Sequence, residues 1–162
     1  RQTRELVPAE VRVVDTRKTT PGLRALEKYA VRCGGCENHR FNLADGVLIK
    51  DNHIRAAGSI AAACAAARSR APFLRMIEVE CETLGQVDEA VAAGADIIML
   101  DNMELPEIRR AVERIGGRAI VEASGNMERR DLWAIAEAGV DVISIGGLTH
   151  SVAAMDISLE FC

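Results

Sequence analysis

Short hydrophobic runs recur along this chain, and each of them ends on a polar residue or a glycine. The runs cover residues 12–15, 47–50, 76–80, 97–101, 120–124 and 142–146. The steps from 80 to 101, from 101 to 124 and from 124 to 146 are 21, 23 and 22 residues long. Each step holds one strand, one helix and two short turns. The pattern therefore predicts a series of repeated strand–helix units.

The segments between these runs carry helix signals. We expect the first helix to end at Gly34 and to bury a stripe formed by Leu23, Leu26, Ala30 and Val31. An Ala-rich helix is expected over 58–70. Thr83 and Gln86 have the spacing of a capping box at the start of the next helix. A later helix should bury Leu105, Ile108, Val112 and Ile115.

The order of these elements predicts the fold. Residues 89–100 resemble residues 134–145, because each segment is a helix end, a glycine stop, an Asp turn and a buried strand. Repeated units of this kind form parallel sheets. A complete eight-unit barrel typically needs about 250 residues, whereas this chain has 162. We therefore expect one domain over 1–162, an open or incomplete TIM-like α/β barrel, with a last strand at 157–161.

Composition narrows the class of protein. A hydrophobic content of 49% with 27% charged residues is typical of a globular domain. A net charge of −4 favours neither nucleic acid nor an anionic membrane as a partner, and the longest apolar run, 60–67, is too short to cross a bilayer. Five cysteines in or beside expected helices and strands indicate a reduced, cytoplasmic protein. Cys33 and Cys36 form a lone CxxC, which we interpret as structural or incidental thiols.

Basic residues follow the early strands. Arg17 offers a planar fork suited to a carboxylate, and Lys18 a compact charge suited to phosphate, although a solvated turn explains both equally well. His39 and Arg40 add donors from a polar loop, where a lone histidine is more often structural than catalytic. Lys50 ends an apolar run and must reach an anion or solvent.

Acidic and glycine-containing segments follow the later strands. Glu80 and Asp101 could bind a metal, accept ribose hydroxyls or act as acid and base, or they could form ion pairs with Lys50 or Arg17. The turns at 124–126 and 146–150 allow backbone N–H groups to approach a phosphate. Because active sites of barrels lie at the carboxyl ends of the strands, these groups together indicate a phosphorylated sugar that meets an acidic partner.

Seven motifs, in order along nearly the whole chain, resemble the nicotinate-nucleotide pyrophosphorylase (carboxylating), or quinolinate phosphoribosyltransferase, family. They are Asp15–Arg24 (DTRKTTPGLR), Asn38–Arg40 (NHR), Leu48–His53 (LIKDNH), Glu78–Glu80 (EVE), Met99–Asn102 (MLDN), Glu122–Gly125 (EASG) and Ser144–Gly146 (SIG). The resemblance implies an open barrel preceded by a smaller sandwich domain, and we expect residues 1–162 to correspond to the barrel alone. It also implies a homodimer or homohexamer in which that domain of one subunit closes the barrel of another and donates an arginine, so activity is expected to require the N-terminal domain.

The reaction implied by the resemblance joins quinolinate and phosphoribosyl pyrophosphate, with magnesium, into nicotinate mononucleotide, pyrophosphate and carbon dioxide. Lys50, Glu80 and Asp101 would be catalytic, and Glu80 and Asp101 would also face Mg²⁺, directly or through substrate or water. The implied substrate-binding residues are Thr16, Arg17, Lys18, His39, Arg40, Lys50, Glu80, Asp101, Ser124, Gly125, Asn126, Gly146, Gly147, Leu148 and His150.

Two alternatives remain open at this stage. The first is a related type II phosphoribosyltransferase or pyrophosphorylase with another acceptor, such as one that uses nicotinate or the molybdenum-transport-associated relative. The second is an inactive barrel fragment that binds phosphate ligands. An assay that compares quinolinate with nicotinate and follows carbon dioxide separates the first, and calorimetry with phosphoribosyl pyrophosphate tests the second.

Overall fold

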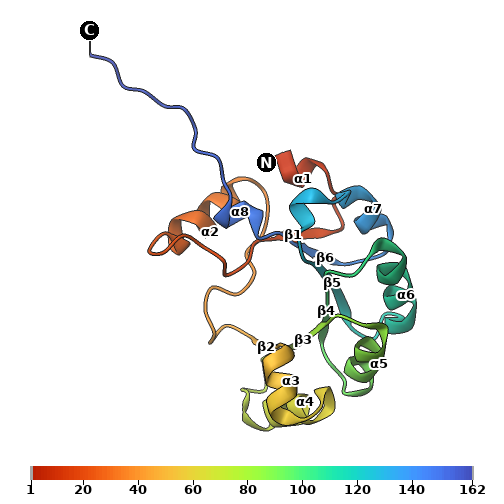
Figure 1. The fold of residues 1–162 in the computed structure, drawn as a ribbon. Coiled ribbons are helices and arrows are strands. Elements are labelled where there is room, and N and C mark those ends of the chain that lie inside the picture. The colour runs from red at the N-terminus through yellow and green to blue at the C-terminus, as the bar shows by residue number, and fades with distance from the viewer. Residues whose placement is uncertain (1, 162) are drawn as a thin grey trace.

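A six-stranded, fully parallel sheet forms the centre of the computed structural model, which describes residues 2–161. The strands stand in the order β1-β6-β5-β4-β3-β2 (Figure 1). Their bounds are β1 Arg12–Val14, β2 Val47–Ile49, β3 Ile77–Cys81, β4 Ile97–Asp101, β5 Ile120–Ser124 and β6 Val142–Ser144. All six lie where the hydrophobic runs predicted them, so the expected parallel α/β architecture is confirmed.

The sheet curves without closing, with β1 and β2 at its two edges. Figure 1 shows the segment between α2 and β2 crossing the open side of this curve. Near its start, Glu37 forms a single parallel bridge with Val14, which extends the sheet by one residue pair. The prediction of an open or incomplete barrel is therefore confirmed.

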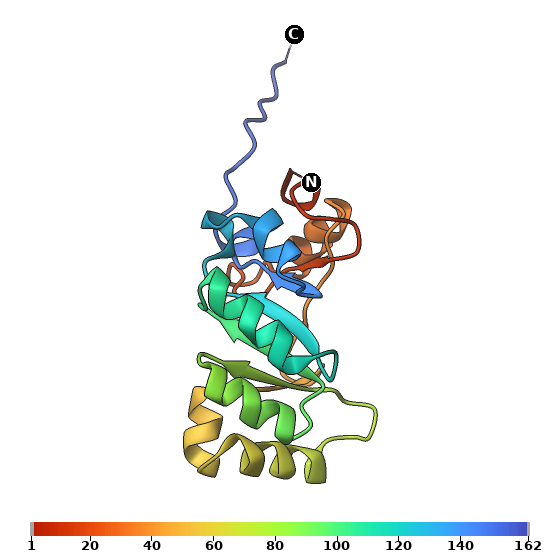
Figure 2. The same ribbon diagram turned by 90° about the vertical axis from the view of Figure 1, so that its right-hand side faces the viewer.

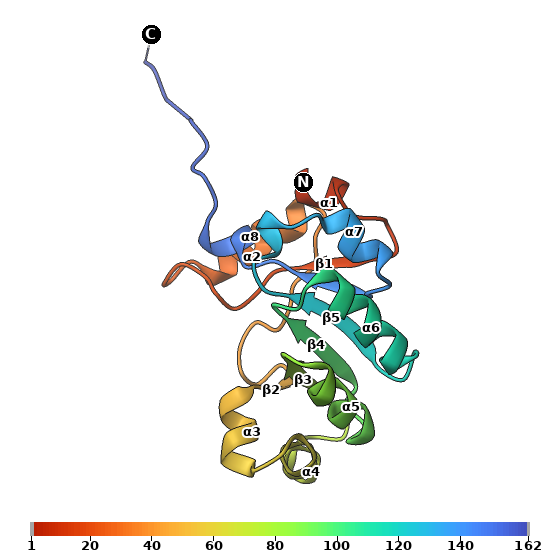
Figure 3. The same cartoon turned by 45° about the vertical axis from the view of Figure 1, so that its right-hand side comes forward.

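Helices follow most of the strands and cover the convex face of the sheet, as Figure 2 shows for α5 and α6. The helices are α1 Gln2–Glu5, α2 Arg24–Cys33, α3 Asp51–Ala57, α4 Ile60–Arg70, α5 Leu84–Ala92, α6 Leu105–Ile115, the 3-10 turn η1 Met127–Arg129, α7 Leu132–Glu137 and α8 Gly147–His150. The capping box of Thr83 and Gln86 is present at the start of α5. α2 and α8 pack together beside β1 (Figure 3). No helix within residues 2–161 is both long and apolar enough to span a membrane.

Alternation along the strands separates a core face from a polar face. In β3, Ile77, Val79 and Cys81 belong to the hydrophobic core beneath the helices. Glu78 and Glu80 between them point to the opposite, concave face, because successive side chains of a strand alternate. The same alternation in the neighbouring strands gives the concave face a polar lining.

Three details differ from the sequence prediction. The stripe expected in α2 is confirmed only at Val31 and is otherwise wrong, because Leu23, Leu26 and Ala30 are exposed. The second buried residue of the helix is Lys28. A separate helix, α3, precedes α4, and Gly58 divides the two in a left-handed conformation (φ +92°).

The strand expected at 157–161 is also wrong. Residues 152–161 have no secondary structure and project away from the sheet (Figure 1), with Ile157 79% and Phe161 92% exposed. Alternating apolar residues form a strand only where a sheet edge is available for pairing. Here the segment makes no strand pairing with either edge.

Candidate active site

A cavity of about 600 Å³ opens at the carboxyl ends of the strands. Its lining comes from every strand end of the sheet and from the loop after α2. The lining residues are Thr16, Arg17, Lys18, His39, Arg40, Leu48, Lys50, Glu80, Met99, Asp101, Asn102, Glu122, Ser124, Gly125, Asn126, Glu128, Ser144, Gly146 and His150. Residues spread over 135 positions, from 16 to 150, thus meet at one mouth.

Of the residues that the sequence suggested for substrate binding, all but Gly147 and Leu148 line this cavity. Gly147 begins α8, where a Cβ atom would contact the side chain of Glu128 at 3.4 Å. Leu148 packs against the hydrophobic core. Gly147 and Leu148 therefore contact neighbouring protein groups and do not line the cavity.

Arg17 and Arg40 form the most strongly basic part of the mouth. Burial lowers the pKa of Arg40, and the positive charge of Arg17 lowers it further. The Arg17 Nε atom is buried and has no hydrogen-bond partner among the described residues. The Arg40 guanidinium donates to the carbonyl of Gly46 at 3.2 Å, which fixes its direction. A bound anion would neutralise the two positive charges and accept a hydrogen bond from Arg17 Nε. This part of the cavity is therefore suited to an anionic ligand.

The acidic residues sit on adjacent strands, each with one partner. Lys50 forms an ion pair with Glu80. This pair was one of the two explanations that the sequence left open for Glu80. The Asn102 side chain donates to Asp101 Oδ2 at 2.9 Å. In the register of the sheet, Asp101 stands beside Ser124. A carboxylate-bearing edge therefore lies directly beside the late turn.

The turn at residues 124–126 packs closely against Asn102. Asn102 and Asn126 both have positive φ, +55° and +51°, and Gly125 has φ +93°. A Cβ atom on Gly125 would lie 2.4 Å from Asn102 Oδ1, so only glycine fits. Asn126 donates to the same Oδ1 at 3.1 Å. Asn102 thereby connects the Asp101 carboxylate to the Gly125–Asn126 turn.

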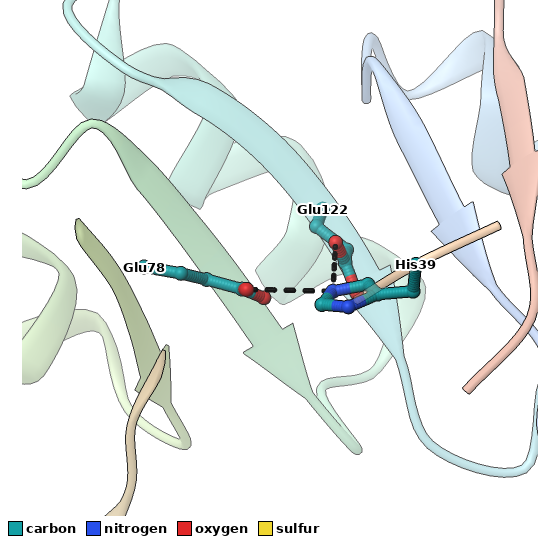
Figure 4. Close-up of side chains that lie close together, drawn as sticks. All are labelled: His39, Glu78 and Glu122. Atoms are coloured by element: carbon teal, nitrogen blue, oxygen red, sulfur yellow. Dashed lines mark ion pairs between the residues drawn. The ribbon is translucent and has the colours of Figure 1, made fainter. Parts of the chain in front are cut away.

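His39 lies at the floor of the cavity between two carboxylates (Figure 4). Its Nε2 is 3.3 Å from Glu78 Oε2 and 3.5 Å from Glu122 Oε2, and both glutamates are almost fully buried. The other ring nitrogen, Nδ1, accepts the backbone N–H of Arg40 at 2.8 Å. Both ring nitrogens of His39 are therefore engaged within the protein.

The cluster retains protons more strongly than its separate groups would. Burial lowers the pKa of His39, but hydrogen bonds and charges of Glu122 and Glu78 outweigh it and raise the pKa to about 10. Burial raises the pKa of Glu78, against the effect of His39. A fully charged ring would, however, set an Nδ1–H against the Arg40 N–H. We therefore interpret the raised pKa as that of the cluster as a whole, with His39 in the neutral Nε2–H form and the retained proton on Glu78.

The same geometry argues against a metal ion in this cluster. His39, Glu78 and Glu122 present ligand atoms within 4.8 Å of one another, and these are ligand types of zinc. A histidine that binds a metal through Nε2 normally donates its Nδ1–H to an acceptor. Nδ1 of His39 instead faces a donor, the Arg40 N–H. A proton, rather than a metal ion, suits the position at Nε2.

A buried ion pair holds the backbone that carries His39. Asp15, at the end of β1, pairs with Lys28 of α2, and the side chains are 0% and 3% exposed. Asp15 also accepts the His39 N–H at 2.9 Å and the Asn38 side-chain N–H at 2.7 Å. Lys28 donates to the His39 carbonyl at 3.0 Å. Because every one of these groups has a partner, the buried charges are compensated.

Several lining residues were missed at the sequence level. They are Leu48, Met99, Asn102, Glu122, Glu128 and Ser144. Leu48, Met99, Glu122 and Ser144 each stand two positions before a strand-end residue, and Glu78 has the same relation to Glu80. Side chains two positions apart in a strand lie on the same face. This alternation could have predicted all five of these residues from the strand-end residues. No sequence signal pointed to Glu128.

Fold and site together define an open α/β-barrel domain with a mouth built for anionic ligands. A family profile described as "Quinolinate phosphoribosyl transferase, C-terminal domain" matches residues 1–160. The chain belongs to this family.

Relatives and solved structures agree with the family assignment. The chain is 52% identical over 151 residues to the probable nicotinate-nucleotide pyrophosphorylase (carboxylating) of Bacillus subtilis, covering 93% of this chain and 52% of that protein. It is 46% identical over 154 residues to the Mycobacterium leprae enzyme of that name, covering 93% and 54%. The structure of NadC from Streptococcus pyogenes superposes with a TM-score of 0.87 at 50% identity, covering 98% of this chain and 56% of that one. The chain thus spans about half the length of these relatives.

Proposed function

We propose that the intact protein transfers a phosphoribosyl group from phosphoribosyl pyrophosphate to quinolinate and releases carbon dioxide, giving nicotinate mononucleotide and pyrophosphate for NAD biosynthesis. The observation that carries this proposal is the pairing of Arg17 with Arg40 at the mouth of the barrel. Quinolinate has two adjacent carboxylates, and such a dianion would neutralise two guanidinium groups that line the same cavity. Relatives named for this reaction support it.

The neighbouring groups suit the second substrate. Glu80 and Asp101 line the same cavity as the two arginines, and we assign them to the ribose of phosphoribosyl pyrophosphate. When pyrophosphate leaves, positive charge develops on the ribose, and nearby carboxylates stabilise it. The quinolinate nitrogen then bonds to the ribose carbon. Breaking the ring–carboxylate bond sends its electron pair to the ring carbon beside the positive nitrogen, and that carbon takes a proton from solvent.

The late turns suit the 5-phosphate of the substrate. Gly125, Asn126 and Gly146 bring backbone close to the cavity, and His150 adds a ring at the same place. A Cβ atom on Gly146 would lie 2.7 Å from His150 Nε2, so the ring and the turn are in close contact. Lys18 and Lys50 are compact cations that line the same cavity, and they are suited to pyrophosphate.

Magnesium fits this arrangement as a substrate-bound ion. Glu80 and Asp101 each engage one carboxylate oxygen with Lys50 or Asn102 and keep a second oxygen. One or two carboxylates together with substrate phosphates are the usual ligands of Mg²⁺. When bound, the ion would offset negative charge on the departing pyrophosphate.

We also infer an assembly and a location. Leu26 and Tyr29 of α2 and Leu43 of the following loop are 66%, 65% and 69% exposed. Large apolar side chains of this kind are often covered by a partner, which supports a homodimer or homohexamer. The four free cysteines among the described residues support a reducing, cytoplasmic setting.

Product analysis tests the proposed reaction. The intact protein is incubated with phosphoribosyl pyrophosphate, Mg²⁺ and either quinolinate or nicotinate, and mononucleotide and carbon dioxide are measured. We expect both products from quinolinate. Mononucleotide from nicotinate without carbon dioxide would favour a related phosphoribosyltransferase, and no product from either would favour a phosphate-binding barrel.

A further inference from the structure

His39 occupies the floor of the cavity, yet neither of its ring nitrogens is free for a ligand. Nε2 lies between the buried carboxylates of Glu78 and Glu122, and Nδ1 accepts the N–H of Arg40. Figure 4 shows the ring between the two strands that carry the glutamates. A histidine that held a substrate carboxylate would have to present an N–H toward the cavity.

The carboxylates determine the tautomer of the ring. Two acceptors at Nε2 require a proton there, and a neutral ring then leaves a lone pair at Nδ1. That lone pair is the acceptor that the Arg40 N–H needs. The backbone direction of Arg40 thus depends on two glutamates that come from β3 and β5, 38 and 82 residues further along the chain.

Arg40 is held at a second point as well, where its guanidinium donates to the carbonyl of Gly46 at 3.2 Å. With its backbone fixed by His39 and its side chain fixed by Gly46, the guanidinium keeps one direction. This matters because Arg17 repels it. Without such restraints, two like charges would separate in the empty site.

We propose that His39 is a positioning residue that aims Arg40, that it makes no direct contact with substrate, and that Glu78 and Glu122 hold its ring in the required tautomer. This inference rests on the proposed function, since it assigns Arg40 to a carboxylate of the pyridine substrate. It adds Glu78 and Glu122 to the residues on which that carboxylate contact depends.

Matched variants separate positioning from direct contact. Asparagine keeps an acceptor at the place of Nδ1, whereas glutamine keeps an amide N–H at the place of Nε2. We expect His39→Gln to raise the quinolinate KM about tenfold, as the loss of a hydrogen bond in a charged site does. His39→Asn should raise it less. The reverse order would overturn the proposal, because it would show that Nε2–H binds the substrate.

A double-variant cycle with Arg40 gives the decisive readout. If His39 acts through Arg40, then His39→Gln has little further effect on the quinolinate KM once Arg40→Ala is present. If the two residues each contact substrate, the two increases multiply. The KM for phosphoribosyl pyrophosphate serves as the internal control and should change by less than about twofold in His39→Gln, because the late turns are untouched.

A spectroscopic measurement tests the tautomer without any activity. Nitrogen-15 NMR of the three histidine rings in the intact protein distinguishes protonated from unprotonated ring nitrogens. We expect His39 to show a protonated Nε2 and an unprotonated Nδ1, and Glu78→Gln with Glu122→Gln to disturb this pattern while that of His53 is unchanged. A protonated Nδ1 at neutral pH would overturn the proposal. Because this readout needs no quinolinate, its failure is distinguishable from failure of the proposed reaction.

Discussion

The ammonium group of Lys28 lies 3.0 Å from the carbonyl oxygen of His39, so helix α2 directly holds the loop at the floor of the cavity. The same ammonium pairs with Asp15, which in turn accepts the His39 N–H. One buried ion pair therefore fixes both sides of the His39 backbone. The ring of that residue is fixed separately, by Glu78 and Glu122.

This arrangement predicts a large loss of stability when one partner of the pair is removed. Lys28→Met leaves the Asp15 charge buried without a counter-ion, and such losses cost about 3–5 kcal/mol. Asp15→Asn in the Lys28→Met background should recover part of that loss, because the uncompensated charge is gone. The free energy of unfolding from urea titration measures each change.

The exposed pair of Arg12 and Glu37 is the control for Lys28→Met. Its side chains are 56% and 51% exposed, and exposed pairs contribute at most about 1 kcal/mol. Arg12→Met should therefore cost far less than Lys28→Met. If Lys28→Met and Arg12→Met lower the free energy of unfolding equally, the buried pair contributes no more to stability than the exposed pair.

Gly125→Ala should impair the late turn by a direct collision. The added methyl group would lie 2.4 Å from Asn102 Oδ1 and would displace the side chain that bonds Asp101. We expect the KM for phosphoribosyl pyrophosphate to rise at least about tenfold, as for a lost hydrogen bond to a charged group. Steady-state kinetics on the intact protein measures this.

Gly117→Ala provides the matching variant for Gly125→Ala. Gly117 also has positive φ, +73°, but a Cβ atom there would meet nothing within 4 Å. Both variants carry backbone strain, whereas only Gly125→Ala carries the collision. If both raise the KM equally, the contact with Asn102 is not the cause.

Asp101→Asn should lower kcat more than it weakens quinolinate binding. The carboxylate lies on the strand next to that of Glu80, and in the proposed reaction its charge would stabilise the transition state for pyrophosphate departure. We expect a fall in kcat of about a hundredfold with a quinolinate KM changed less than threefold. The exposed Glu104, changed to Gln, removes the same charge at a distance and should leave both constants unaltered. A loss confined to quinolinate affinity would place Asp101 in the carboxylate site instead.

The His39 cluster predicts a pH dependence of stability. Burial raises the folded-state pKa of Glu78 above its ordinary value of 4.5, and the retained proton of the cluster lies on this carboxyl. A raised pKa stabilises the folded state at pH below the unfolded-state pKa, and this stabilisation is lost as pH rises through the folded-state pKa. The free energy of unfolding should therefore fall as pH rises above about 4.5 and through the folded-state pKa of Glu78.

Glu78→Gln isolates the contribution of the cluster to this pH dependence, because an amide has no proton to release. The fall in stability as pH rises above about 4.5 should be smaller in Glu78→Gln than in the parent protein. Chemical denaturation at a series of pH values gives both curves. Parallel curves would show that the retained proton lies elsewhere.

Much of the fold could be predicted because its signals are local. Strand positions follow from short apolar runs, and parallel pairing follows from the helix-length spacing between them. The rim residues Lys50, Glu80 and Asp101 were found because strand ends mark the mouth of a barrel. Glu78 and Glu122 were missed because only the ends of the strands were considered, not the positions two residues earlier.

Other features depend on contacts that local patterns do not specify. Lys28 is buried because its partner, Asp15, comes from β1 and because the His39 carbonyl meets it, so a helical stripe of apolar residues gave the wrong face for α2. The alternation of Ile157, Leu159 and Phe161 is a good strand pattern, but pairing requires a free sheet edge nearby. Tertiary context decides both cases.

The most direct test of a dianion site at Arg17 and Arg40 is calorimetric titration of the intact protein with quinolinate and, separately, with nicotinate, which lacks one of the two carboxylates. We predict that quinolinate binds at least about tenfold more tightly, as one additional charged hydrogen-bonding contact provides, and that Arg40→Ala removes most of this difference. Equal affinity for the two acids in the unaltered protein would contradict the assignment of both guanidinium groups to substrate carboxylates.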